Sequence, residues 1–151
     1  MSSLRSAIDK FALNYLTSNL EYLRNRHAGE SCYILGGGPS LKYFDLKKLD
    51  EEQIIGTNTI VFHKDFEYLK SIKYVSIIEP WYFQHRLIQP RRFSAISQLT
   101  AQYRQIVKNS SEISFFVNLS NYGRLNYANV HYLYRNIPSF SGTDPKLSDM
   151  D

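Results

Sequence analysis

The sequence contains a single cysteine, Cys32, among 151 residues. One cysteine cannot form an internal disulfide, which fits a reducing compartment, and its place in an apolar segment predicts a small buried residue. No apolar run approaches the ~18 residues of a membrane-spanning helix. The N-terminus is not typical of a signal peptide, because charged and amide side chains interrupt its apolar residues. These absences together predict a cytoplasmic protein.

Dense basic runs are missing too, although the net charge is +4. The basic residues are scattered rather than grouped beside stacking aromatic residues, so nucleic-acid binding is not expected. The mild positive charge instead favours small anionic ligands. A zinc site is not expected either, because no pair of histidines has metal-ligand spacing; they are His27, His63, His85 and His131.

Aromatic residues are abundant, with 12 Tyr and 9 Phe, and the length suits one domain with a real core. Apolar segments of strand length alternate with segments of helical period. Strands are predicted at 31–35, 53–58, 73–78, 113–117 and 129–134, and helices at 4–26, 60–72 and 93–108, with a short helical or irregular segment at 41–49. This alternation predicts an α/β fold: a Rossmann-like three-layer domain with a mainly parallel sheet.

Three regions follow from this pattern. Residues 1–30 form an N-terminal amphipathic helix, whose apolar face either packs on the sheet or binds a partner. Residues 31–138 are predicted to form the Rossmann-like domain, and residues 139–151 an irregular tail without helix or strand pattern. No helix that could cover the sheet is predicted after the fifth strand. The domain is therefore either complete without such a helix or incomplete at its C-terminus.

A glycine turn follows the first predicted strand and consists of Gly36, Gly37, Gly38, Pro39 and Ser40. Glycine allows positive φ angles and a close approach of a ligand to the backbone, and proline suits the first turn of a helix. The N–H groups of such a turn suit a phosphate or diphosphate. The turn has neither the Gly-x-Gly-x-x-Gly fingerprint nor the Gly-Lys-Ser/Thr of a Walker loop. The alternative is a tight strand-to-helix connection that binds nothing.

Small and polar residues also follow the next strands: Thr57 and Asn58 after the second, Glu79 and Pro80 after the third, and Asn118 after the fourth. Ligands of parallel sheets bind outside the carboxyl ends of the strands, so we expect these residues at one site. Asn58 would bond a ribose or base, or else cap the following helix. Glu79 would bind a ribose hydroxyl or Mg²⁺, or else remain a solvated carboxylate.

The segment 81–92 is aromatic and basic and is predicted to be a loop at the mouth of this site. His85 is the candidate for a catalytic base there. The arginines either close over a diphosphate or form a solvated basic loop; they are Arg86, Arg91 and Arg92. The aromatic side chains either stack on a base or sugar ring or pack in the core; they are Trp81, Tyr82 and Phe83.

The segment 27–41, His-Ala-Gly-Glu-Ser-Cys-Tyr-Ile-Leu-Gly-Gly-Gly-Pro-Ser-Leu, resembles the opening of the 6-hydroxymethylpterin diphosphokinase-like proteins of archaea and their bacterial relatives. Those typically read His-x-Gly-x-x-Cys-hydrophobic-Ile-Gly-Asn-Gly-Pro-Ser-Leu. The likeness covers residues 27–82 and includes the Asp-Leu-x-x-Leu that begins at Asp45. A more distant likeness is to bacterial sialyltransferases with a Gly-Asn-Gly-Pro-Ser-Leu motif. Gly37 replaces the usual Asn, and Glu79 replaces an Asp or Asn.

The resemblance implies a transferase that binds a nucleotide or nucleotide-sugar, glycosyltransferase-like, in surface glycan biosynthesis. Its partners would be that nucleotide and a glycan or small-molecule acceptor, and Mg²⁺ is a possible cofactor but not a required one. One alternative is an ATP-dependent diphosphokinase acting on 6-hydroxymethylpterin, which would need Mg²⁺. Another is a truncated, non-catalytic binding module. The relatives continue after a Ser-Gly-Thr-like turn, whereas this sequence ends at Asp151, soon after its own Ser141-Gly142-Thr143.

Overall fold

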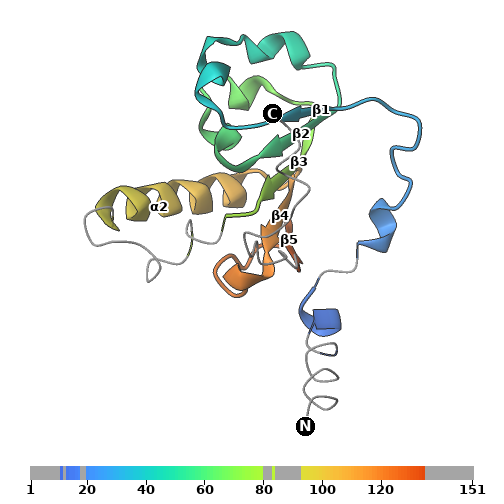
Figure 1. Cartoon of the computed structure of the whole chain (residues 1–151), viewed down its shortest axis with the longest axis vertical. Coiled ribbons are helices and arrows are strands. Elements are labelled where there is room, and N and C mark those ends of the chain that lie inside the picture. The colour runs from blue at the N-terminus through green and yellow to red at the C-terminus, as the bar shows by residue number, and fades with distance from the viewer. Residues whose placement is uncertain (1–10, 12, 18–19, 80–82, 84–92, 135–151) are drawn as a thin grey trace, which may run out of the picture.

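The computed structural model describes residues 11, 13–17, 20–79, 83 and 93–134. Five strands form one all-parallel sheet in the order β1-β2-β3-β4-β5 (Figure 1). The strands are β1 Tyr33–Leu35, β2 Ile54–Thr57, β3 Ile72–Ile77, β4 Ser114–Asn118 and β5 Val130–Leu133. All five predicted strands are confirmed. The chain is an α/β domain of Rossmann-like type.

One face of the sheet, here the covered face, packs on the connecting segments. When each strand pairs with the next along the chain, right-handed crossovers all fall on the same side of the sheet. Val75, Phe115 and Val117 are fully buried on this side. They belong to one core with apolar residues of the connections, including Leu46, Ile60, Leu69, Tyr103 and Val107. Because the strand order never reverses, the described strands form no crevice between diverging crossovers.

The main connection is helix α2, Phe93–Asn109, which confirms the helix predicted at 93–108. It buries Tyr103, whose ring meets the ring of Phe62 edge-on at 4.6 Å. Just before β5, the Asn129 side chain holds the end of α2 in place. Its Nδ2 group donates to the carbonyl oxygens of Val107, Ser110 and Ile113 at 3.0, 2.8 and 3.2 Å.

The helix predicted at 60–72 is wrong. That connection consists of two short 3-10 helices, η4 Asn58–Phe62 and η5 Phe66–Tyr68. Its first turn contains β-branched Thr59, Ile60 and Val61, which disfavour an α-helix. The segment 41–49 is helical in short pieces, as predicted, with η2 Pro39–Tyr43 and η3 Leu46–Leu49.

The N-terminal helix predicted at 4–26 does not continue through residues 20–26. Residues 11 and 13–16 are helical, but η1 Glu21–Leu23 is a 3-10 helix and turns follow to residue 29. Asn25 and Gly29 have positive φ angles of 57° and 84°, which no continuous helix allows. Phe11 and Tyr15 are 74% and 79% exposed. The remaining residues of 1–12 and the tail 139–151 lie outside the described residues.

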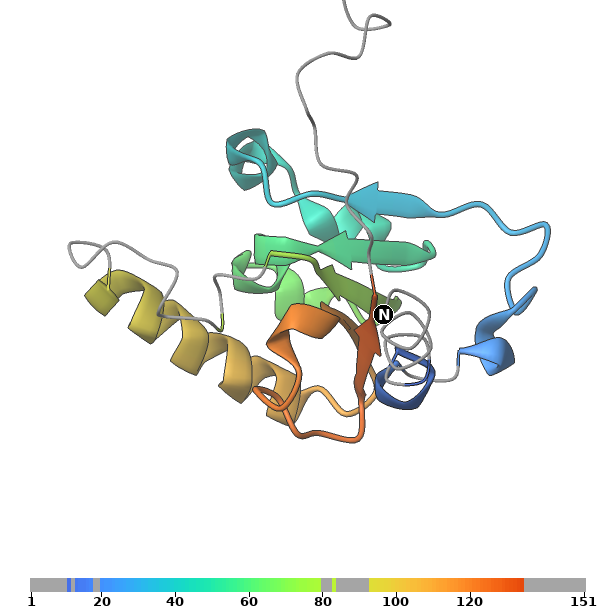
Figure 2. The ribbon, with the colours of Figure 1, turned by 60° about the horizontal axis from the view of Figure 1, so that its bottom comes forward.

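The other face of the sheet, here the open face, includes Ile34, Ile55, Tyr74, Phe116 and His131. Among the described segments, the strap, residues 20–30, lies against this face, on the far side of the sheet from α2 (Figures 1 and 2). Its contacts are polar and aromatic. Tyr22 Oη lies 3.3 Å from His131 Nε2, and His27 Nε2 lies 2.8 Å from Tyr74 Oη.

Candidate functional site

The predicted site residues lie along the carboxyl edge of the sheet. Because all five strands are parallel, the ends of β1, β2, β3 and β4 share one edge. The glycine turn Gly36–Ser40 follows β1, Asn58 follows β2, and Glu79 lies two residues after β3. All five residues of the turn are exposed, so it lies on the surface at this edge.

The glycines of the turn are not needed for positive φ angles, so that expectation is wrong. Neither Gly36, Gly37 nor Gly38 has a positive φ, and Gly38 is extended, at φ −67° and ψ 156°. Gly37 is required for another reason, since a Cβ at this position would overlap Thr59 Oγ1. An Asn at this position would meet the same overlap.

Hydrogen bonds hold the turn by its carbonyl groups. Thr59 Oγ1 donates to Gly37 O at 3.3 Å, and Leu41 N donates to Gly38 O at 3.0 Å. Beside it, Thr57 Oγ1 donates to Leu35 O at 3.2 Å. Within the described part of the chain, no residue accepts a hydrogen bond from the N–H groups of Gly36, Gly37 or Gly38. These N–H groups are therefore available to an anion.

Asn58 connects the ends of β2 and β3. Its Oδ1 accepts a hydrogen bond from Ile78 N at 3.2 Å, and its φ is +47°, in the left-handed region that Asn tolerates. It is not the N-cap of η4, which is Thr57, so the helix-cap interpretation is wrong. Its Nδ2 group donates to none of the residues that the structure describes, which leaves a donor at the ends of β2 and β3.

Glu79 and Asn118 complete this edge. Glu79 is half-buried and forms no ion pair with another described residue. Its carboxylate can therefore accept a hydroxyl or bind a cation. Asn118 Oδ1 accepts from Ser120 N at 2.9 Å and caps η9 Leu119–Asn121.

The loop residues of the predicted mouth lie largely outside the described residues; this applies to His85, Arg86, Arg91, Arg92, Trp81 and Tyr82. Phe83 is described and is 1% exposed. Its ring packs 5.6 Å from that of Tyr103. For Phe83, packing in the core is therefore the correct interpretation.

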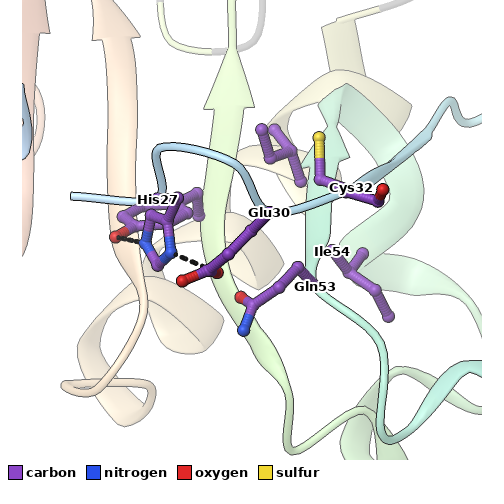
Figure 3. Close-up of a pocket in the computed structure, with 8 residues that line it drawn as sticks. His27, Glu30, Cys32, Gln53 and Ile54 are labelled. Carbon is purple, nitrogen blue, oxygen red and sulfur yellow. Dashed lines mark hydrogen bonds and ion pairs between the residues drawn. The ribbon is translucent and has the colours of Figure 1, made fainter. Parts of the chain in front are cut away.

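Cys32 was expected to be buried and is exposed. It precedes β1 on the edge of the sheet, where no other described strand pairs with β1. It lines a small cavity of about 130 Å³ at the amino end of the sheet, together with His27, Glu30 and Tyr74 (Figure 3). His27 Nδ1 lies 2.9 Å from Glu30 Oε2, while its Nε2 faces Tyr74 Oη. This cluster fastens the strap and lies at the end of the sheet opposite the glycine turn.

A second cavity, of about 270 Å³, lies on the open face at the carboxyl ends of β3, β4 and β5. Ser76, Phe116 and Asn118 contribute to its lining. Sequence reasoning missed this cavity. The available signal was alternation, because these positions in β3 and β4 point away from the covered face.

Comparison with known proteins assigns no family, because no family model, curated protein or solved structure matches the chain. Among the described helices, none is long and apolar enough to cross a bilayer. The described His, Cys, Asp and Glu residues form no group of three or more that could hold a metal ion. Function must therefore be inferred from the carboxyl edge itself.

Proposed function

We propose that the chain binds a nucleotide or nucleotide-sugar at its carboxyl edge and acts as a glycosyltransferase-like transferase in surface glycan biosynthesis, in the cytoplasm. One observation supports this most directly: in the exposed turn the carbonyls of Gly37 and Gly38 accept hydrogen bonds, while the N–H groups of Gly36–Gly38 donate to no described residue. Backbone N–H groups arranged in a turn bind phosphate oxygens. The resemblance of residues 27–82 to nucleotide-using transferases agrees with this proposal.

The chemistry would begin with the donor phosphate on the turn. As the sugar is transferred, negative charge develops on the departing phosphate, and fixed N–H donors stabilise that charge. Thr59 holds Gly37 by its carbonyl, so the donors are oriented before the ligand arrives. Asn58 would direct its free Nδ2 group to a ribose or base. His85 remains the predicted catalytic base.

Ligand-induced thermal stabilisation tests this proposal. We expect the unfolding temperature to rise with at least one of CMP, UDP, GDP and ATP, since a ligand at 100 times its Kd adds about 2.7 kcal/mol to stability. Ser40→Asp should abolish the shift by repelling phosphate from the exposed turn, whereas Ser40→Asn should retain it. No shift with any of the four nucleotides at millimolar concentration would overturn the proposal and favour a non-catalytic binding module.

The half-buried Glu79 carboxylate, without an ionic partner among the described residues, favours a second candidate. A carboxylate at this edge could hold Mg²⁺ beside bound phosphates, as diphosphate transfer from ATP requires. Incubation with ATP, Mg²⁺ and 6-hydroxymethylpterin, and separately with sugar nucleotides, distinguishes the two reactions by their products. A pterin diphosphate that disappears in Glu79→Gln and in EDTA would establish the second candidate instead.

A further inference from the structure

The cavity at the carboxyl end of the open face has the character of a ligand site. Its volume is about 270 Å³, and its lining is mainly apolar with a few polar groups, as in sites for small organic ligands. It lies beside strand ends, where parallel sheets bind their ligands. The lining residues are Ser76, Ile78, Phe116, Val117, Asn118, Leu133 and Tyr134.

Strand register connects this cavity to the glycine turn. Thr57, Ser76 and Phe116 are neighbours in one row across the open face. Gly36 continues the row, since a Cβ built there would lie 3.9 Å from Thr57 Oγ1. The row therefore contains only small side chains between the turn and the Phe116 ring. Neighbouring strands lie about 4.8 Å apart, so β1 and β4 are separated by about 14 Å, which is comparable with an extended nucleotide.

The groups in the cavity suit a flat heterocycle. Phe116 is half-buried and supplies an aromatic ring, which base-binding sites use for stacking. Asn118 has its Oδ1 occupied by Ser120 N, so its Nδ2 group is the part left to donate to a ligand. The Ser76 hydroxyl, on the neighbouring strand, can donate or accept. Stacking together with a few hydrogen-bonding groups is how proteins recognise a nucleobase.

We propose that this cavity is the subsite for the base of the nucleotide, which would lie across the open face with its phosphates on the glycine turn. The phosphate part of this arrangement rests on the proposed function, whereas the base part rests on the cavity alone. The two parts can therefore fail separately.

The experiment uses the full chain labelled with ¹⁵N and unphosphorylated probes. Adenosine, guanosine, cytidine and uridine are titrated one at a time, and inorganic pyrophosphate is titrated separately. We expect at least one nucleoside to shift the amide signals of Ser76, Phe116 and Asn118, and pyrophosphate to shift those of Gly36–Gly38. Phe116→Leu should weaken nucleoside binding about 5-fold or more, because stacking on an aromatic ring contributes about 1–3 kcal/mol per base.

Two further variants complete the test. Asn118→Asp keeps an oxygen acceptor for Ser120 N but removes the Nδ2 donor, so it should change the order of preference among the four nucleosides. Phe66→Leu is the matched control, since Phe66 is also half-buried but lines a separate cavity with residues of η5 and α2; its nucleoside affinity should equal that of the wild type.

The remaining outcomes distinguish failure of the base subsite from failure of the phosphate site. If nucleotides bind but no nucleoside shifts Ser76, Phe116 and Asn118, or if Phe116→Leu binds as the wild type does, the base subsite is overturned while the proposed function stands. If nucleosides bind at the cavity and pyrophosphate does not shift Gly36–Gly38, the base subsite stands and the phosphate site is overturned.

Discussion

At the scale of single residues, Gly37 is the position where the glycine turn depends most on having no side chain. A Cβ at Gly37 would overlap Thr59 Oγ1 and lie 3.0 Å from Thr59 Cβ, so Gly37→Ala must displace the Thr59 side chain, η4 or the turn. Overpacking of this kind costs about 1–3 kcal/mol, and we expect urea unfolding to show a loss of that size. Gly38→Ala is the control, because its nearest neighbour would be 3.9 Å away. Equal losses in both variants would contradict a specific contact between Gly37 and Thr59.

Asn58 is a second residue whose contribution to stability can be predicted. Asn58→Ala removes the acceptor of Ile78 N and places alanine at a φ of +47°, so we expect a loss of about 2 kcal/mol in unfolding free energy. Asn58→Asp keeps an oxygen acceptor and tolerates this φ, so most of the stability should remain. Its added negative charge should nevertheless weaken nucleotide binding. If Asn58→Asp unfolds as easily as Asn58→Ala, the hydrogen bond to Ile78 N does not hold these strand ends together.

The sequence predicts which residues lie at the carboxyl edge, but not how they are used. Thr57 and Asn58 could be placed there because each apolar strand changes to small and polar residues at a definite position. The left-handed conformation of Asn58 and its bond to β3 depend on how closely two strand ends approach. The overlap between Gly37 and Thr59 likewise arises between residues 22 positions apart. Local patterns contain no information on such distances.

At the scale of elements, Asn129 joins α2 to the start of β5. Its Nδ2 group donates to three carbonyl oxygens. Val107 lies in α2, whereas Ser110 and Ile113 lie between α2 and β4. Asn129→Ala leaves those partly buried carbonyls without this donor, so we expect a loss of about 1–3 kcal/mol in urea unfolding. The exposed Asn126 provides the control, and Asn126→Ala should change stability by less than about 0.5 kcal/mol. A similar small effect of Asn129→Ala would show that α2 is held by its apolar face alone.

Prediction of the elements succeeded where one pattern dominated the segment. The five strands are short apolar runs bounded by polar residues, and α2 has a regular helical period. The segment 60–72 failed because its apolar spacing fits a helix while its β-branched residues and short crossover favour tight turns. The prediction for the N-terminal segment failed at residues 20–26, since the strap bends to bring Tyr22 and His27 to the open face. This bend depends on the positions of Tyr74 and His131 in the sheet, which are far from the strap in the sequence.

At the scale of the whole molecule, the sheet is covered unequally on its two faces. The core lies between the covered face and the connecting segments, whereas the strap has no buried residue. Its attachments include two pairs of Tyr and His, one at each end: Tyr22 with His131, and His27 with Tyr74. Segments held by so few buried contacts open at low free-energy cost. The strap should therefore respond to changes in its histidine contacts more readily than the core does.

Acidification tests this view through His131. Desolvation by burial lowers the pKa of His131 from its usual 6.5, because Tyr22 and Phe116 pack on the ring without a described charged group beside it. Below pH 6.5 the unfolded chain therefore takes up this proton more readily than the folded chain. The contribution of neutral His131 to stability is complete above pH 6.5 and declines as the pH falls toward the lowered pKa.

The measurement compares unfolding free energies of wild type and His131→Gln at pH 7.5 and pH 5. Gln keeps a polar side chain but does not titrate, so the wild type should lose more stability on acidification than the variant does. Hydrogen exchange should place the change in strap residues 20–30 and β5, not in α2, because His131 touches the strap and lies in the last strand. Equal acid losses in both proteins would mean that His131 gains its proton without disturbing the strap, and that the strap keeps its contacts with the open face throughout this pH range.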